Sequence, residues 1–190
     1  MIRLFPILLL LAAACSPAQT QEMRPTADPA VPRSAQKVEK IKNPGRVVHV
    51  LVALCDNENQ GIVPVPAHLG NGEDPVRNLY WGAAFGVKTY FSRSKNWELI
   101  DTIAKPSDDV LERLVFKHRT ANVYLVADAY RGSRMRKTID DFFDSASGAV
   151  RENVKVGDAL IQIRAGSDLV AFVGHDGLMD FKLDREIERA

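Results

Sequence analysis

In the segment LVAFVGHDGLMD, residues 169–180, an unbroken apolar run ends abruptly in small and polar residues. The run is short and rich in β-branched and aromatic residues, which favours a buried strand over a helix. Gly174 and Gly177 flank His175 and Asp176 and allow the backbone to turn sharply there. A histidine at the carboxyl end of a buried strand occupies the position where an open α/β sheet usually places its ligand or its chemistry.

Two further apolar runs have the same character. Residues 47–54 and residues 123–128 are nearly continuous apolar sequence, typical of central parallel strands, and each is followed by an acidic or polar turn. Residues 97–100 predict a short edge strand, and residues 159–163 are apolar but fit a strand or a helix equally well.

Three helices are expected between these strands. Asp74-Pro75 is a helix start, followed by apolar residues at helical spacing as far as Phe91. Ser107 is the expected N-cap of a second helix over about 107–118, and a third runs from about Met135 to residues 147–148. The alternation predicts an α/β fold with a mainly parallel sheet flanked by helices on both faces, a three-layer α/β/α arrangement.

Composition excludes several classes of function. The 190 residues include 25 Lys and Arg against 24 Asp and Glu, so no strong positive field attracts nucleic acid. Two cysteines form no disulfide scaffold, and no Cys/His spacing indicates a zinc site. The loop after the first strand is acidic rather than glycine-rich, which argues against phosphate binding. We therefore expect neither cofactor nor structural metal.

The N-terminus predicts export. Residues 1–14 combine a positive start with an apolar run too short to span a bilayer permanently, and small residues precede Cys15. This resembles a bacterial lipobox, which implies diacylglycerol and an acyl chain on Cys15, membrane anchoring, and, with Ser16, retention at the outer membrane. An ordinary secretory signal is the alternative. Residues 15–44 are expected to form a disordered Pro/Ala-rich tether, and residues 45–190 an α/β domain, for which C-terminal truncation is one expectation.

Parallel strands bring the loops at their carboxyl ends to one edge of the sheet. The side chains expected at this edge form a candidate binding rim. They are Asp56, Asn57, Glu58, Asp128, Arg131, His175 and Asp176.

Gly174-His175-Asp176-Gly177 after a hydrophobic strand resembles the histidine strand of caspase-like cysteine peptidases, the clan of clostripain, gingipain, legumain and caspases. The resemblance implies that His175 is the general base or orienting group for a thiolate and that the Gly177 amide helps to bind an oxyanion. In that clan a cysteine follows the next strand, and residues 181–190 contain none. Cys55 follows a different strand and is expected to be a buried structural residue.

The sequence therefore predicts an exported, lipid-anchored domain that resembles a cysteine peptidase but is incomplete or inactive in this chain. One alternative is a non-catalytic envelope module that binds a small polar ligand or a peptide or protein partner. Another is a metal-dependent hydrolase that uses the acids and His175 of the rim.

Overall fold

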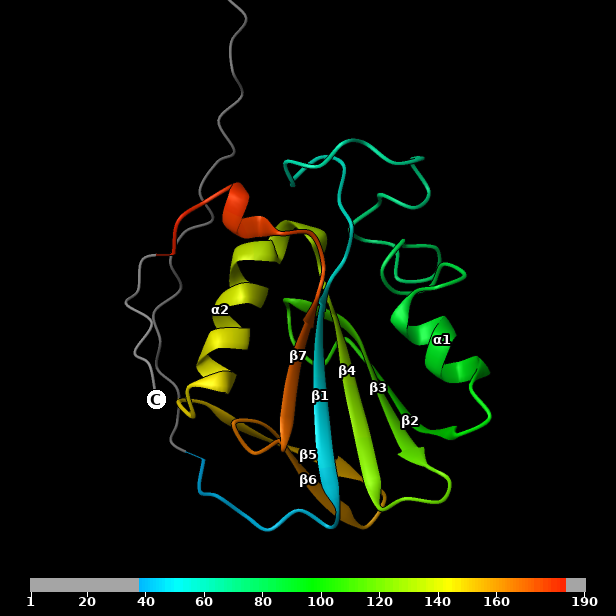
Figure 1. The fold of residues 1–190 in the computed structure, drawn as a ribbon, viewed down its shortest axis with the longest axis vertical. Helices are drawn as coiled ribbons and strands as arrows, with labels where there is room; N and C mark the ends of the chain where they lie inside the picture. Colours follow the sequence, from blue (N-terminus) through cyan, green and yellow to red (C-terminus); the bar gives the residue numbers. More distant parts are fainter. Residues whose placement is uncertain (1–37, 184–190) are drawn as a thin grey trace, which may run out of the picture.

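The fold is built on a mixed sheet of five strands. The computed structural model describes residues 38–183, and the strand order is β2-β3-β4-β1-β7 (Figure 1). Strand β1 pairs in parallel with β4 on one side and β7 on the other, while β3 is antiparallel to both β4 and β2. The strands are β1 (Arg46–Ala53), β2 (Trp97–Ala104), β3 (Val110–His118), β4 (Val123–Tyr130) and β7 (Leu169–Val173).

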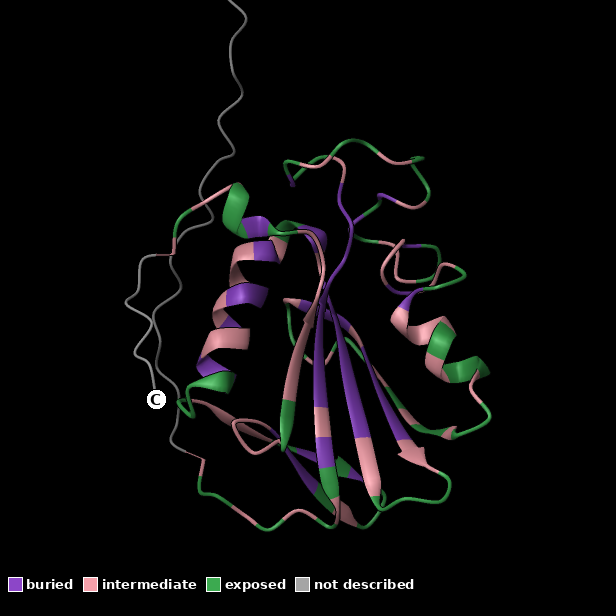
Figure 2. Cartoon of the chain, in the orientation of Figure 1, coloured by how far each residue is buried: buried purple, intermediate pink, exposed green. Residues whose placement is uncertain are grey.

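The two faces of the sheet are covered differently. Helix α2 (Met135–Ala146) and a separate hairpin, β5 (Arg151–Val156) with β6 (Ala159–Arg164), cover one face. The short helix α1 (Val87–Arg93) and the turns before it, with buried Trp81, cover the other. Buried residues concentrate in the central strands β1 and β4 (Figure 2), because apolar side chains project from both faces of these strands into the core.

The predicted three-layer α/β/α fold is wrong. The chain is mainly strand, the sheet is mixed rather than mainly parallel, and a β-hairpin takes the place of a helix over part of one face. Valines and isoleucines of the hairpin, with Ile161 and Ile163 fully buried, supply the apolar cover that a helix would otherwise provide.

Two of the three expected helices are absent or shortened. Residues 74–86 form irregular turns, and only Val87–Arg93 is helical. At Gly82 an added Cβ would lie 2.1 Å from the Val76 carbonyl oxygen, so this backbone crossing requires glycine. The expected helix after Ser107 is instead strand β3, because pairing with both β2 and β4 outweighs the local capping pattern. The helix from Met135 is confirmed as α2.

The chain reaches β1 along the end of the hairpin. Buried Gln162 of β6 donates from Nε2 to the Glu39 carbonyl, and Asn43 exchanges hydrogen bonds with the Gln162 backbone. These contacts fall within the range expected for the tether. The predicted signal sequence, Cys15 and the rest of the tether lie outside the described residues. No described helix has the length and hydrophobicity needed to cross a membrane.

A buried ion network connects the sheet to its cover. The guanidinium of Arg113 on β3 donates to Asp128 on β4 from Nε at 2.6 Å and Nη2 at 2.8 Å, and His49 Nε2 lies 3.1 Å from the same carboxylate. Arg113 also pairs with Glu152 on β5 at 2.6 Å. From there Arg164 of β6 continues the network to α2. It lies 2.9 Å from Glu152 and 3.2 Å from Asp141, which also accepts from Tyr130 Oη.

The opposite charges within this network keep its buried carboxylates ionised. Burial alone raises the pKa of Asp128, but the hydrogen bonds and charge of Arg113, with the His49 contact, outweigh it and hold that pKa well below its usual value. Glu152 behaves in the same way, since Arg113 and Arg164 overcome the effect of burial and lower its pKa. Burial raises the pKa of Tyr130, which keeps its hydroxyl as the donor to Asp141.

Asp128→Asn is expected to destabilise the fold by about 3–5 kcal/mol, because it leaves the Arg113 guanidinium buried without its counter-charge. Urea denaturation followed by circular dichroism measures the change. Glu98→Gln is the matched control, since it breaks the exposed Arg119–Glu98 pair and is expected to cost less than about 1 kcal/mol. Equal losses in the two variants would contradict the assignment of this network as a stabilising element.

Stability is expected to fall as the pH is lowered below about 5. The folded-state pKa values of Asp128 and Glu152 lie below their unfolded values of about 3.9 and 4.3, so the native state binds fewer protons than the unfolded chain. Their contribution is complete above the unfolded values and is lost as the pH falls toward the folded ones. Urea unfolding midpoints at pH 6, 4 and 3 test this prediction. The fall in midpoint with pH should be smaller in the double variant Asp128→Asn/Glu152→Gln than in the unsubstituted chain. A midpoint independent of pH would disprove it.

Candidate functional site

The carboxyl ends of β1, β4 and β7 lie side by side and form what we call the carboxyl rim, residues 54–61, 131–134 and 174–180. The loop leaving β1 is fixed by two buried amides. Asn78 accepts from the Cys55 amide at 3.0 Å and donates to the Cys55 carbonyl at 2.8 Å. Gln60 donates to the carbonyls of Leu54 and Gly132, which joins the β1 loop to the β4 loop.

Asp56 stabilises this loop from within. The residue is only 5% exposed. Its carboxylate accepts hydrogen bonds from the Glu58 amide and from the amide and side chain of Asn59. Gly72 and Gly132 pack against it so closely that a Cβ on either would lie less than 3.0 Å from Asp56. The Asp56 carboxylate is therefore fully engaged in loop structure rather than open to a ligand.

His175 and Asp180 form the polar pair of the rim. Both belong to the segment after β7, His175 Nε2 lies 3.1 Å from Asp180 Oδ2, and each side chain is 17% exposed. The same Asp180 oxygen accepts from the Gly61 amide of the β1 loop at 3.1 Å. The β1 loop therefore orients the carboxylate that holds the imidazole, a relation that fixes both the rotamer and the tautomer of a histidine.

The neighbouring residues have their polar groups occupied. The Gly177 amide already donates to the His175 carbonyl at 2.9 Å, so the oxyanion role that the resemblance implied is not open to it in this arrangement. Asp176 is exposed and accepts from the Leu178 amide at 3.3 Å, which begins the short 3₁₀ turn η2 (Gly177–Met179).

The other expected rim residues are dispersed. Asp128 lies inside β4, fully buried and opposite Leu51, and belongs to the ion network rather than to the rim. Arg131 is at the rim, but it donates to the Asp108 carbonyl and pairs with Glu73. Asn57 bonds to the Val65 backbone through both of its side-chain atoms, while Glu58 is exposed.

Cys55 is not placed as a nucleophile. It is fully buried, and burial together with the charge of Asp56 raises the pKa of its thiol, whereas a reactive cysteine needs the opposite shift. Its position agrees with the expected structural role.

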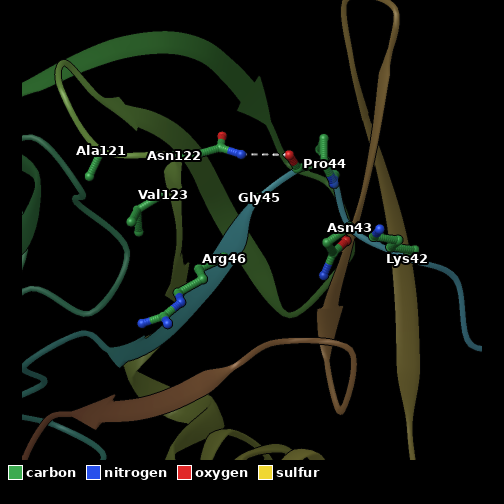
Figure 3. A pocket seen from close by; sticks show the side chains of 8 residues that line it. All are labelled: Lys42, Asn43, Pro44, Gly45, Arg46, Ala121, Asn122 and Val123. Carbon is green, nitrogen blue, oxygen red and sulfur yellow. Dashed lines mark hydrogen bonds between the residues drawn. The ribbon is translucent and has the colours of Figure 1, made fainter.

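No group of three or more His, Cys, Asp or Glu side chains within residues 38–183 is arranged to hold a metal ion. The metal-dependent alternative thus gains no support. A cleft of about 660 Å³ lies at the opposite end of the sheet, between the segment 42–46 and residues 121–123 (Figure 3). It cannot serve the His175–Asp180 pair.

Comparison of the chain with protein-family models, curated proteins and solved structures found no match. The geometry of the carboxyl rim is therefore the basis for a functional proposal.

Sequence reasoning missed three residues that build the rim: Asp180, Asn78 and Gln60. A carboxylate five residues after His175 was a usable signal, because a turn brings such residues together. Nothing in the sequence around Asn78 or Gln60 distinguishes them from ordinary loop residues, since their role depends on burial beside β1.

Asn78→Ala is expected to expose Cys55, because the Cys55 amide and carbonyl both lose their buried partner. In a chain carrying Cys15→Ser, the rate of modification by a thiol reagent should rise about tenfold or more over that with Asn78 intact. Asn71→Ala is the control, since Asn71 Oδ1 contacts only the exposed Glu73 amide. An unchanged rate in Asn78→Ala would show that Asn78 does not hold this loop.

Proposed function

We propose that the carboxyl rim is the histidine side of a cysteine-peptidase-like site, in which His175 accepts the proton of a thiol. The observation that carries this proposal is the contact between His175 Nε2 and Asp180 Oδ2 at 3.1 Å, with Asp180 held by the Gly61 amide. Its place at the end of a parallel strand, on the motif Gly174-His175-Asp176-Gly177, adds further support.

The chemistry follows from the pair. Asp180 accepts the Nε2 proton, so Nδ1 carries the lone pair and serves as the base. When Nδ1 takes a thiol proton, the resulting imidazolium is stabilised by the carboxylate, and the thiolate attacks a carbonyl carbon to form a tetrahedral intermediate. When the tetrahedral intermediate collapses, the bond to the leaving amine or alcohol breaks and the imidazolium returns the proton to that group. The acyl group stays on sulfur as a thioester.

This sequence provides the base but no nucleophile for it. Cys55 is buried, and Cys15 belongs to the predicted lipobox. In the proposal the chain by itself has no peptidase activity, and a thiol from outside it completes the site. We also propose, from the N-terminal sequence, that the chain is exported and anchored to the bacterial envelope through lipidated Cys15, where a peptide or protein partner meets the rim.

A small thiol can test the base directly. The chain carrying Cys15→Ser is expected to accelerate transfer of an acetyl group from p-nitrophenyl acetate to 2-mercaptoethanol at pH 7. His175→Ala should remove the chain-dependent rate, and Asp180→Asn should lower it about tenfold, because the amide neither selects the tautomer nor stabilises the imidazolium.

His68→Ala is the matched control, because His68 is an exposed histidine on the loop after β1. Its substitution should leave the rate unchanged. Equal losses for His68→Ala and His175→Ala, or no rate above that of buffer, would overturn the proposal.

A further inference from the structure

Positive side chains gather at the end of the sheet opposite the carboxyl rim. Arg46 begins β1 beside Val123 at the start of β4, and Lys117 lies opposite Tyr124 near the end of β3. Lys95 precedes β2, in which Glu98 lies opposite Lys117 in the backbone register. We call this cluster the basic end; it comprises Lys40, Lys42, Arg46, Lys95 and Lys117.

These cations are not neutralised within residues 38–183. Lys40, Lys42, Arg46 and Lys95 are exposed, and none of them has a carboxylate partner among the described residues. Lys117 donates to Asn122 and lies 3.7 Å from the centroid of the Tyr124 ring, and it forms no ion pair within residues 38–183. Several basic side chains elsewhere, those of Lys88, Arg113, Arg131, Lys137 and Arg164, are paired with acids, while Lys105, Lys155 and Lys182 are exposed without an ion pair among the described residues.

The few acidic side chains at the basic end are hydrogen-bonded or ion-paired, or are fewer than the cations around them. Glu98 pairs with Arg119, and the Asp168 carboxylate accepts from the Val47 amide at 2.7 Å. Glu39 is the remaining exposed carboxylate on the segment that leads into β1. The carboxyl rim, in contrast, carries Asp56, Glu58, Asp176 and Asp180, and its two arginines, Arg131 and Arg134, are paired with Glu73 and Asp109. Although the formal net charge of the chain is only +1, unpaired positive charge is therefore greater at the basic end than at the rim.

The basic end is hollowed. Lys42 and Arg46 line the cleft of about 660 Å³ together with Asn122, whose side chain donates to the Pro44 carbonyl and fixes one wall (Figure 3). A concave site with two cations at its edge and an uncompensated lysine behind Asn122 suits an anionic headgroup.

The path of the chain indicates which anion it meets. The 37 residues before the described part lead into β1 at this same end. From Cys15 to residue 38 an extended chain reaches at most about 80 Å, so an anchored Cys15 confines the domain to this distance from the bilayer and raises the local concentration of the basic end there. We propose that the basic end rests on the anionic phospholipid surface of the membrane. This inference rests on the lipid anchor proposed above and adds an orientation to it, in which the carboxyl rim faces away from the bilayer.

The strength of electrostatic attraction between basic side chains and an anionic membrane can be stated. Each Lys or Arg close to an anionic surface strengthens binding roughly fivefold, and the effect decays over about 8 Å at physiological ionic strength. Binding should therefore require anionic lipid and weaken in high salt.

Vesicle co-sedimentation tests the proposal on the full chain carrying Cys15→Ser, which has no lipid of its own. Binding to vesicles of 30% phosphatidylglycerol in phosphatidylcholine should be stronger than to phosphatidylcholine alone, and Lys42→Glu/Lys95→Glu should weaken it about 25-fold or more. Residues 1–37, including the positive start of the chain, are the same in all variants, so a difference between variants reports on the substituted lysines alone.

Lys105→Glu/Lys182→Glu is the matched control, with the same change of charge near the other end of the sheet, and it should weaken binding less than about threefold. Thermal unfolding of each variant checks the fold. Equal losses in both double variants would show that net charge rather than the basic end governs binding. That result, or equal binding to both vesicle types, would overturn the proposal and leave the His175 assay unaffected.

Discussion

The Arg113–Asp128 ion pair joins strands β3 and β4 inside the protein and, through Glu152, links them to the hairpin β5–β6. Two charges buried between β3 and β4 are tolerated only when each is paired with an opposite charge and hydrogen-bonded. Glu152 and His49 complete that requirement from the hairpin and from β1. The pair therefore fixes the register of three strands and the position of the hairpin, and through Arg164 it also fixes α2. His49 Nδ1 remains without a hydrogen-bond partner among the described residues.

The ion network also determines the position of the carboxyl rim. Because β1 and β4 are immobilised by the network, the loops that leave them start from fixed points, and Asn78 and Gln60 carry that order outward to Gly61. The Gly61 amide then sets the Asp180 carboxylate, which sets the His175 ring. A histidine positioned by such a chain of contacts needs no bound ligand to reach its working orientation.

The parts of the fold that the sequence predicts are those whose cause is local. The continuous apolar runs of β1, β4 and β7 need burial on both faces, and the spacing from Met135 to Phe143 identifies α2. Strand β3 could not be identified, because Ser107 and the acids after it form a good helix start and only pairing with two neighbours overrides it. His175 lies just after β7, at the strand end that its flanking glycines predicted. Asp128 was misplaced because strand ends were read from polarity, and a buried acid inside a strand has the same signature until its arginine partner is known.

The hydrogen bonds between Asn43 and Gln162 have a mechanical consequence. Tension applied through the N-terminal part of the chain reaches residues 39–43 before it reaches β1, so the contacts with β6 bear the load first. Those contacts couple the pull to the hairpin, whose Glu152 and Arg164 belong to the ion network. Force on the N-terminus is thereby shared between two sheets instead of being concentrated on the ladder between β1 and β7, which is only five residue pairs long.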